Sequence, residues 1–554
     1  MNIKRSLLIA LFCCFTLFGF APLEIYFSIY EDVWFGFEHI ISLVLLLFFT
    51  SFFCLFVFLI ALTKLNEKWS EYIDTLLFAV VMSAYVQGNF LPSAFGSMDG
   101  QSVDWSAYGV ENVLSIALWF MVISVSFWLL HAIGKEKFFA GIKIIMICVL
   151  LVQTVTLVTV CITTEGLKTK NSAAFLDRNQ FSFSKEKNVI VLVLDMYDSQ
   201  VFKAICEEEG NEEYLEPLDG FTYYPDTVGA YSSTYSAIPH ILTGEKYLNN
   251  KPLNEYINEA YVDSPLLADL VENKYEVNIY TNEAIPTEKM SYEFINNYLP
   301  QEESDMEITS KKKMIMYLGK LVGIRYLPQP LKRFCWFYSA ELWDVKGVKY
   351  QDELYSLDNF IFNDRISEAN AETIGNTFHF YHVEGAHPPC YYDENLNKID
   401  TNLSLQGQEG MIRNGKGMLV LVGHLLQELK DLGIYDNCAI VVMADHGGGF
   451  SEGDRSVGLD RANPLLLVKG FEEKHPLEIS DMRLSYDNLQ DAFQRLLDGY
   501  GGEHIFADAI GKNENRYYIS LSNWQEYVTD GYASDASKLK QTGVVYGKQY
   551  INPD

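Results

Sequence analysis

The sequence predicts a five-helix transmembrane anchor followed by an exported α/β/α sandwich with a mostly parallel sheet. Two observations lead to this fold class. First, residues 1–165 of the 554 contain only 7 Lys and Arg and 12 Asp and Glu, whereas residues 166–554 contain 35 and 60. Second, the charged part has continuous β-branched runs that alternate with helical patterns. Such an alternation is typical of parallel sheets covered on both faces.

Composition excludes several other classes of protein. An aromatic content of 14% without a short repeat or heptad excludes disordered, collagen-like and coiled-coil chains. A formal net charge of −30 excludes a nucleic-acid partner, because phosphate backbones would repel the chain. Only four of the nine Cys lie after residue 165, too few and too scattered for a disulfide framework or a zinc ribbon.

The apolar part contains five runs long enough to cross a hydrocarbon core of about 30 Å. They lie near 6–22, 39–62, 73–92, 113–133 and 143–163. Lys4 and Arg5 precede the first run as in a signal peptide. However, no small-residue cleavage site follows it and four more runs come next, so we expect an uncleaved, multi-pass anchor.

The positive charges predict the orientation of this anchor. With a cytoplasmic N-terminus, the inner segments carry seven bases and the outer loops at 23–38 and 93–112 carry none. The seven are Lys4, Arg5, Lys64, Lys68, Lys135, Lys137 and Lys143. Five spans then place everything after Thr164 on the outer face. The alternative is an even number of spans with a cytoplasmic domain, in which one run does not cross.

The remaining chain is divided by its pattern of strands and helices. We expect a transmembrane domain at 1–165, a linker at 166–187, a catalytic domain at 188–500 and a C-terminal appendage at 501–554. Strands are predicted at 188–194, 277–280, 378–383, 439–443 and 465–468, and helices near 254–273, 415–431 and 486–498. In such sheets ligands bind at the carboxyl ends of the strands.

Polar residues follow three of the predicted strands. Asp195 follows the first, Asp445 and His446 follow the fourth, and His382 and His387 lie at and just beyond the end of the third. Two carboxylates with an imidazole form a mixed oxygen and nitrogen site suited to Mn²⁺, Zn²⁺ or Mg²⁺. Taken singly, each carboxylate could instead cap the next helix.

A hydroxyl-rich turn supplies one more candidate. Residues 230–244 read AYSSTYSAIPHILTG, a turn that leads into a short apolar helix ending at Gly244. Thr234 lies at the predicted start of this helix, where free N–H groups favour an anion. It becomes a nucleophile only if a metal or base lowers the pKa of its hydroxyl; otherwise the turn is only an N-cap.

Four blocks, in order, resemble the alkaline phosphatase/sulfatase superfamily. They are VIVLVLDMYD, STYSAIP, HVEGAHPP and LKDLGIYDNCAIVVMADHGG, and they extend over about residues 188–470. With the five spans, they are most similar to the membrane-anchored branch that contains lipoteichoic acid synthases and lipid A phosphoethanolamine transferases. The sulfatase motif C/S-x-P-x-R, which supplies formylglycine, does not occur in the sequence.

The resemblance implies a role for each matched residue. Asp195, Thr234, Asp445 and His446 would hold one divalent metal, with Mn²⁺ favoured over Zn²⁺ and Mg²⁺, and Thr234 would be the nucleophile. His382 and His387 would bind the substrate phosphate, transfer protons or hold a second metal. Asp195 stands where the transferases usually have Glu, and no His follows His446 within a dozen residues. Arg461 is the base we expect to hold a phosphate oxygen.

The resemblance also implies a function and a location. The expected enzyme lies in the bacterial cytoplasmic membrane with its catalytic domain outside. It moves a phospho-alcohol head group, glycerol phosphate or phosphoethanolamine, from a phospholipid donor to a glycolipid or polysaccharide acceptor through a phosphothreonine. Two alternatives stay open: an extracytoplasmic phosphodiesterase or sulfatase-type hydrolase, and a non-catalytic sulfatase-like envelope protein.

A basic segment supports access to lipid. Residues 311–349 contain nine Lys and Arg next to Trp336, Phe337 and Tyr338, in an otherwise acidic section. This composition suits a segment that lies on anionic head groups. The alternative is an ordinary helix whose aromatic side chains pack into the domain.

Overall fold

The computed structural model divides the chain into two compact units. It describes residues 2–30, 33–91, 95, 103, 105–164, 166–167, 173–287, 294–300, 306–338, 340–348, 353–388, 392–399, 407–450, 453–509 and 515–547. One unit, the membrane unit, comprises residues 1–172 and 305–349, and the other, the α/β unit, comprises 173–304 and 350–554. The expected boundaries at 188–500 did not separate 305–349 from the second unit.

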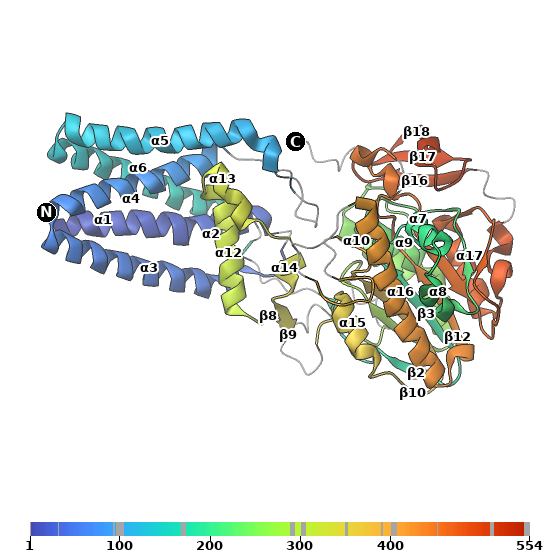
Figure 1. Ribbon diagram of the computed structural model, residues 1–554. Coiled ribbons are helices and arrows are strands. Elements are labelled where there is room, and N and C mark those ends of the chain that lie inside the picture. The colour runs from blue at the N-terminus through green and yellow to red at the C-terminus, as the bar shows by residue number, and fades with distance from the viewer. Residues whose placement is uncertain are drawn as a thin grey trace. The chain divides into compact units, whose positions relative to one another are not determined.

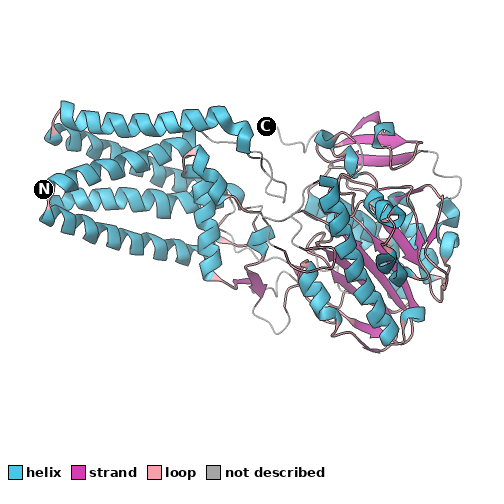
Figure 2. Ribbon diagram, in the orientation of Figure 1, coloured by secondary structure: helices cyan, strands magenta, loops and turns pink. Residues whose placement is uncertain are grey.

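The membrane unit consists of five helices that are long and apolar enough to cross a membrane, as predicted (Figure 2). The first combines α1 (Asn2–Cys14), a π-helical turn (Phe15–Phe20) and α2 (Ala21–Ile29). The others are α3 (Phe37–Leu65), α4 (Glu67–Phe90), α5 (Gly109–Ala132) and α6 (Lys135–Thr163).

Buried polar pairs lie inside this helical bundle. Arg5 Nε approaches Asp74 Oδ2 at 2.7 Å, and Ser115 Oγ donates to Gln87 Oε1 at 2.7 Å. Polar contacts between helices are favoured in an apolar environment, so the pairs fix how the helices face one another.

The two ends of the inserted segment 305–349 pair with each other as short strands. β8 (Met306–Ile308) pairs antiparallel with β9 (Lys346–Val348), and between them lie α12 (Lys311–Tyr326), α13 (Gln329–Lys332) and α14 (Ala340–Trp343). Phe337 is buried and Trp336 packs against Phe95 and Trp105. The aromatic side chains therefore pack into the membrane unit.

The α/β unit is built on a seven-stranded sheet in the order β14-β4-β13-β12-β3-β11-β6. The bounds are β3 (Asn188–Leu194), β4 (Thr222–Tyr223), β6 (Tyr275–Tyr280), β11 (Asn376–Val383), β12 (Cys438–Met443), β13 (Leu466–Lys469) and β14 (Glu478–Ile479). β3 is buried along its whole length. This agrees with the continuous apolar run that predicted it.

Helices cover both faces of this sheet, so the α/β/α sandwich is confirmed (Figure 1). One apolar core lies under α9 (Thr234–Thr243), α10 (Leu253–Asp263), α11 (Pro265–Glu272) and α17 (Leu489–Leu497). The other lies under α7 (Ser199–Glu207), α8 (Glu212–Leu215), α15 (Asn359–Ile366) and α16 (Gly407–Asp431).

The sheet is mostly parallel, as predicted, with one reversed strand. β6, β11, β3 and β12 are parallel to one another, and β14 is parallel to β4, whereas β13 runs antiparallel to both β12 and β4. The chain between β12 and β13 contains only short 3₁₀ turns in its described part and no crossover helix. Without a crossover helix, the chain returns antiparallel.

The appendage after residue 500 ends in an antiparallel sheet of β16 (Arg516–Ser520), β17 (Gln525–Thr529) and β18 (Lys540–Val545). Arg516 is buried and its Nη1 donates to Asp226 Oδ1 at 2.7 Å. This buried ion pair joins the small sheet to the α/β unit.

Candidate metal centre

The register of the central strands places four of the candidate residues at one edge of the sheet. β12 and β11 both pair in parallel with β3, so that Met443 and His382 lie beside Val193. Asp195 follows β3 and Asp445 follows β12 by two residues. The carboxyl ends of the three strands therefore bring both carboxylates and His382 together.

Asp195, Asp445 and His446 form a compact set of possible metal ligands. One ligand atom of each lies within 4.8 Å of the others. His446 Nε2 is 3.3 Å from Asp445 Oδ2 and 4.0 Å from Asp195 Oδ1. Thr234 Oγ1 lies 3.4 Å from the same nitrogen. The structure thus brings together all four residues that the resemblance implied as ligands.

Backbone contacts orient two of these side chains. Met196 N–H donates to Asp445 Oδ1 at 3.1 Å, and His446 Nδ1 lies 2.9 Å from the carbonyl oxygen of Gly447. Because a carbonyl only accepts, this contact places the proton of a neutral His446 on Nδ1. It leaves Nε2 free to bind a metal or to accept from Thr234.

The donor set fits a divalent cation. Asp195 Oδ1 and Asp445 Oδ2 are shielded from solvent and have no hydrogen-bond donor among the described residues. Buried carboxylate oxygens without donors are costly, and a cation between them satisfies both. Two carboxylates, an imidazole and a hydroxyl would hold such an ion and suit Mn²⁺, Zn²⁺ or Mg²⁺.

The electrostatics of the two carboxylates differ. Burial alone would raise the pKa of Asp195, but the nearby His382 and the charges of His387 and His446 hold it below its usual range. Burial, with the charge of Asp195, raises the pKa of Asp445. The crowded negative charge is a second reason why the site suits a cation.

Thr234 is the first residue of α9. The N-cap, Ser233, has extended backbone and makes no side-chain cap, so first-turn N–H groups stay available. The other end of the helix closes at Gly244 in the left-handed conformation, as the sequence predicted. Thr234 is half-buried and faces His446, so the N-cap alternative does not describe its side chain.

His382 is buried between the carboxylate and a hydroxyl. Its Nε2 lies 3.7 Å from Asp195 Oδ2, and its Nδ1 lies 3.2 Å from Thr281 Oγ1. Burial alone would lower the pKa of His382, but the contact with Asp195 raises it above its usual value. A histidine in this position can carry a proton next to the metal centre.

His387 and Arg461 lie at the margin of the site. His387 is half-buried and influences Asp195 through its charge; its Nδ1 lies 2.5 Å from the carbonyl oxygen of Pro388. Arg461 Nη1 donates to the carbonyl oxygen of Ser232 at 3.4 Å, two residues before Thr234. Arg461 is thus attached to the turn that precedes Thr234.

Sequence reasoning missed a third carboxylate near the centre. Glu283 lies three residues after β6, and its N–H donates to Thr281 Oγ1 at 3.0 Å. Burial raises the pKa of Glu283 to about 7, although the charge of His382 lowers it. The rule that sites follow strand ends could have found it, since the strand at 277–280 was predicted.

Several solved structures are similar to this chain. No protein-family model and no curated protein matches the sequence. The solved structure of Ps i-CgsB matches with 15% identity and a TM-score of 0.39, over 62% of this chain and 81% of that one.

A transferase and a synthase also match. The integral membrane protein lipooligosaccharide phosphoethanolamine transferase A from Neisseria meningitidis is 11% identical with a TM-score of 0.36, over 91% of this chain and 97% of that one. The lipoteichoic acid synthase LtaP from Listeria monocytogenes is 13% identical with a TM-score of 0.35, over 67% and 86%. Another match is a protein of the alkaline phosphatase superfamily from Vibrio parahaemolyticus.

Proposed function

We propose that this protein is a membrane-anchored, metal-dependent phosphotransferase of the sulfatase-like alkaline phosphatase superfamily. It moves a phospho-alcohol head group, glycerol phosphate or phosphoethanolamine, from a phospholipid to a glycolipid or polysaccharide of the cell envelope. The observation that carries the proposal is the placement of Thr234 Oγ1 3.4 Å from His446 Nε2, beside Asp195 and Asp445.

A divalent ion held by Asp195, Thr234, Asp445 and His446, with Mn²⁺ favoured, would lower the pKa of the hydroxyl and offset charge on a phosphoryl oxygen. Thr234 loses its proton to water and its Oγ1 attacks phosphorus. The bond from phosphorus to the diacylglycerol oxygen breaks, and a proton from His387 or His382 neutralises this oxygen.

The second half of the reaction regenerates the enzyme. An acceptor hydroxyl gives its proton back to the histidine and attacks the phosphothreonine. The bond from phosphorus to Thr234 Oγ1 breaks, Oγ1 takes a proton back from water, and a phosphodiester is released. Turnover is therefore ping-pong. Arg461, attached to the nucleophile turn, holds a phosphoryl oxygen during both steps.

Variants of adjacent hydroxyls test this proposal. With Mn²⁺ and labelled phosphatidylglycerol or phosphatidylethanolamine, Thr234→Ala should lose turnover by at least about a thousandfold. Ser233→Ala is the matched control, because Ser233 makes no side-chain cap, and it should keep most of its turnover. Full turnover of Thr234→Ala with metal bound would exclude Thr234 as the nucleophile.

The destination of the label distinguishes transferase from hydrolase. Label in a lipid or polysaccharide product supports transfer. Label released only as a free soluble phosphoester would favour the alternative, in which water resolves the phosphothreonine and the enzyme is a phosphodiesterase.

A further inference from the structure

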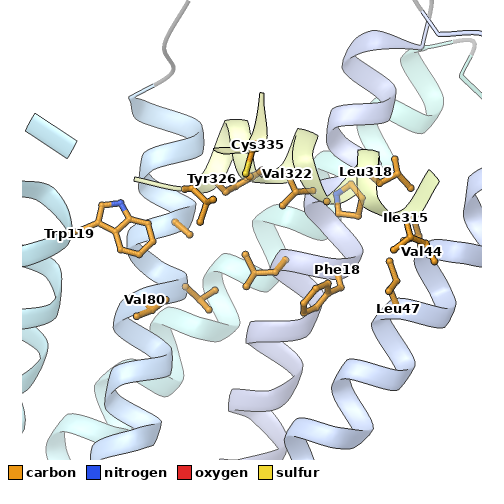
Figure 3. A pocket seen from close by; sticks show the side chains of 17 residues that line it. Phe18, Val44, Leu47, Val80, Trp119, Ile315, Leu318, Val322, Tyr326 and Cys335 are labelled. Carbon is orange, nitrogen blue, oxygen red and sulfur yellow. The ribbon is translucent and has the colours of Figure 1, made fainter. Parts of the chain in front are cut away.

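The membrane unit contains an apolar cavity of about 370 Å³. Its walls come from four of the five spanning helices, and α12 closes it (Figure 3). The wall residues include Phe18, Val44, Val80 and Trp119 from the spans and Leu318 and Val322 from α12. Side chains of carbon and one sulfur, with few polar atoms, face this space.

The cavity lies at one end of the helical bundle. It involves the C-terminal halves of the first span and of α4 and the N-terminal halves of α3 and α5. Because consecutive spans run in opposite directions, these parts belong to the same end of the bundle. α12 lies across that end (Figure 1). With a cytoplasmic N-terminus, this is the outer end.

The cavity is large enough that we expect a molecule to occupy it. Protein interiors are close-packed, and an apolar cavity of only about 150 Å³ stays dry and takes up benzene. A space more than twice as large, lined by carbon and open to a bilayer, is filled by an apolar chain. Lipid acyl chains are the apolar molecules present at the highest concentration around such a bundle.

A polar group at the cavity wall points to the same ligand. Trp119 Nε1 is shielded from solvent and has no hydrogen-bond acceptor among the described residues. Figure 3 shows its indole ring at one side of the cavity. Since an orphaned donor in an apolar environment is costly, it suits the ester carbonyl of a lipid whose chain fills the space.

The segment over the cavity is positively charged. Residues 311–340 contain seven Lys and Arg and no Asp or Glu, in a chain with a net charge of −30. Lys311, Lys312, Lys313 and Arg333 are exposed, and so are Leu331 and Phe334 at 46% and 68%. Exposed bases next to exposed apolar side chains are typical of a segment at the surface of an anionic bilayer.

We propose that this cavity binds one acyl chain of an anionic phospholipid, whose ester region meets Trp119 and whose head group lies against the bases of 311–340. The inference goes beyond the proposed function, because it concerns a site in the membrane unit and does not require that the bound lipid is the donor.

Gly319 offers a way to fill the cavity without disturbing the protein. It lines the cavity from α12, and a Cβ added there would have no atom within 4 Å. Leu is also a better helix former than Gly, so Gly319→Leu should fold. Gly141 in α6 is the matched control, since its added Cβ would also have no atom within 4 Å and it lines no part of this cavity.

The experiment uses the full chain in vesicles that contain phosphatidylglycerol with a photoreactive acyl chain. We expect one crosslinked lipid per chain on cavity peptides, a loss of at least fivefold in Gly319→Leu and no change in Gly141→Leu. Lys312→Glu with Arg333→Glu should lower the preference for phosphatidylglycerol over phosphatidylcholine. Equal labelling of Gly319→Leu and the unsubstituted protein, or labelling only on outer faces of the spans, would overturn the inference. Thr234→Ala should leave the crosslinking of lipid to cavity peptides unchanged, so this experiment tests lipid binding separately from the proposed reaction.

Discussion

Gly385 lies where the 382–387 segment passes closest to the metal centre. Its φ is +61°, and a Cβ would lie 2.2 Å from Asp195 N. The glycine of the H-x-x-G-x-H pattern is therefore required by both conformation and space. The pattern identified this segment in the sequence, whereas the contact with Asp195 depends on the pairing of β11 with β3.

Gly385→Ala should lower the free energy of unfolding by at least about 3 kcal/mol and abolish metal binding, because the segment must move away from Asp195. Gly375→Ala is the matched control: its φ is +88° but an added Cβ meets nothing within 4 Å. Gly375→Ala should lower the free energy of unfolding by about 1–2 kcal/mol, through backbone strain alone. Thermal unfolding and Mn²⁺ titration of both variants measure the difference, and equal losses would contradict the contact.

The raised pKa of Glu283 predicts that the stability of the metal-free protein depends on pH. Its pKa is raised from 4.5 to about 7, so the folded state holds a proton that the unfolded state has released. Stability is lost as pH rises from about 4.5 to 7 and stays lower above. Glu283→Gln should therefore match the unsubstituted protein at pH 4.5 and unfold at a higher temperature at pH 8, both measured with chelator. A higher unfolding temperature already at pH 4.5 would point to another cause.

At the scale of elements, α15 holds the segment that carries the two histidines. Asn359, its first residue, is fully buried; its Nδ2 donates to Gly385 O at 3.0 Å and its Oδ1 accepts from Gly385 N at 2.9 Å. No pattern in the sequence linked 359 to 385, because the contact joins a helix start to a loop through side-chain geometry alone.

Asn359→Ala leaves the N–H of Gly385 without its acceptor and leaves its carbonyl oxygen with the Tyr392 hydroxyl alone. We expect a loss of about 2–4 kcal/mol in unfolding free energy and a lower turnover. Asn363→Ala on the same helix is the control, since its Oδ1 only contacts His424 Nδ1 at an exposed position, and it should change stability by no more than about 0.5 kcal/mol. Denaturant unfolding compares the two variants. Equal losses of unfolding free energy would argue against a stabilising role of the hydrogen bonds between Asn359 and Gly385.

The strands show what the sequence could and could not determine. The apolar runs that predicted β3, β11 and β12 contain residues buried on both faces, so their pattern is unambiguous. The direction of β13 was not predicted because its apolar run at 465–468 looks the same in either orientation. Asp195, Asp445 and His446 were found because they follow recognised strands within sequence motifs, whereas Glu283 also follows a recognised strand, β6, but lies in no motif.

At the scale of the whole molecule, the five spans were predicted from length and apolarity, which a bilayer imposes directly. The assignment of 305–349 to the membrane unit was not predicted, because its bases and aromatic side chains suit either unit by composition. Its packing against the spans depends on contacts such as Gln329 N–H donating to Ser115 Oγ of α5 at 2.9 Å.

The predicted orientation can be measured in intact cells. In a chain without other cysteines, Lys474→Cys, in the exposed part of the α/β unit, should react with a membrane-impermeant maleimide. Lys68→Cys, exposed near the start of α4, should react only after permeabilisation. The reverse pattern would place the α/β unit in the cytoplasm and contradict an extracytoplasmic enzyme.

The central claim is that Thr234 becomes covalently phosphorylated. The most direct test is the intact mass of the purified full chain after incubation with Mn²⁺ and phosphatidylglycerol or phosphatidylethanolamine, without an acceptor. We predict a mass gain on the peptide that contains Thr234, equal to glycerol phosphate or phosphoethanolamine with loss of water, and no gain in Thr234→Ala. Head-group release with no adduct on Thr234 at any time, and an undiminished rate in Thr234→Ala, would contradict the account.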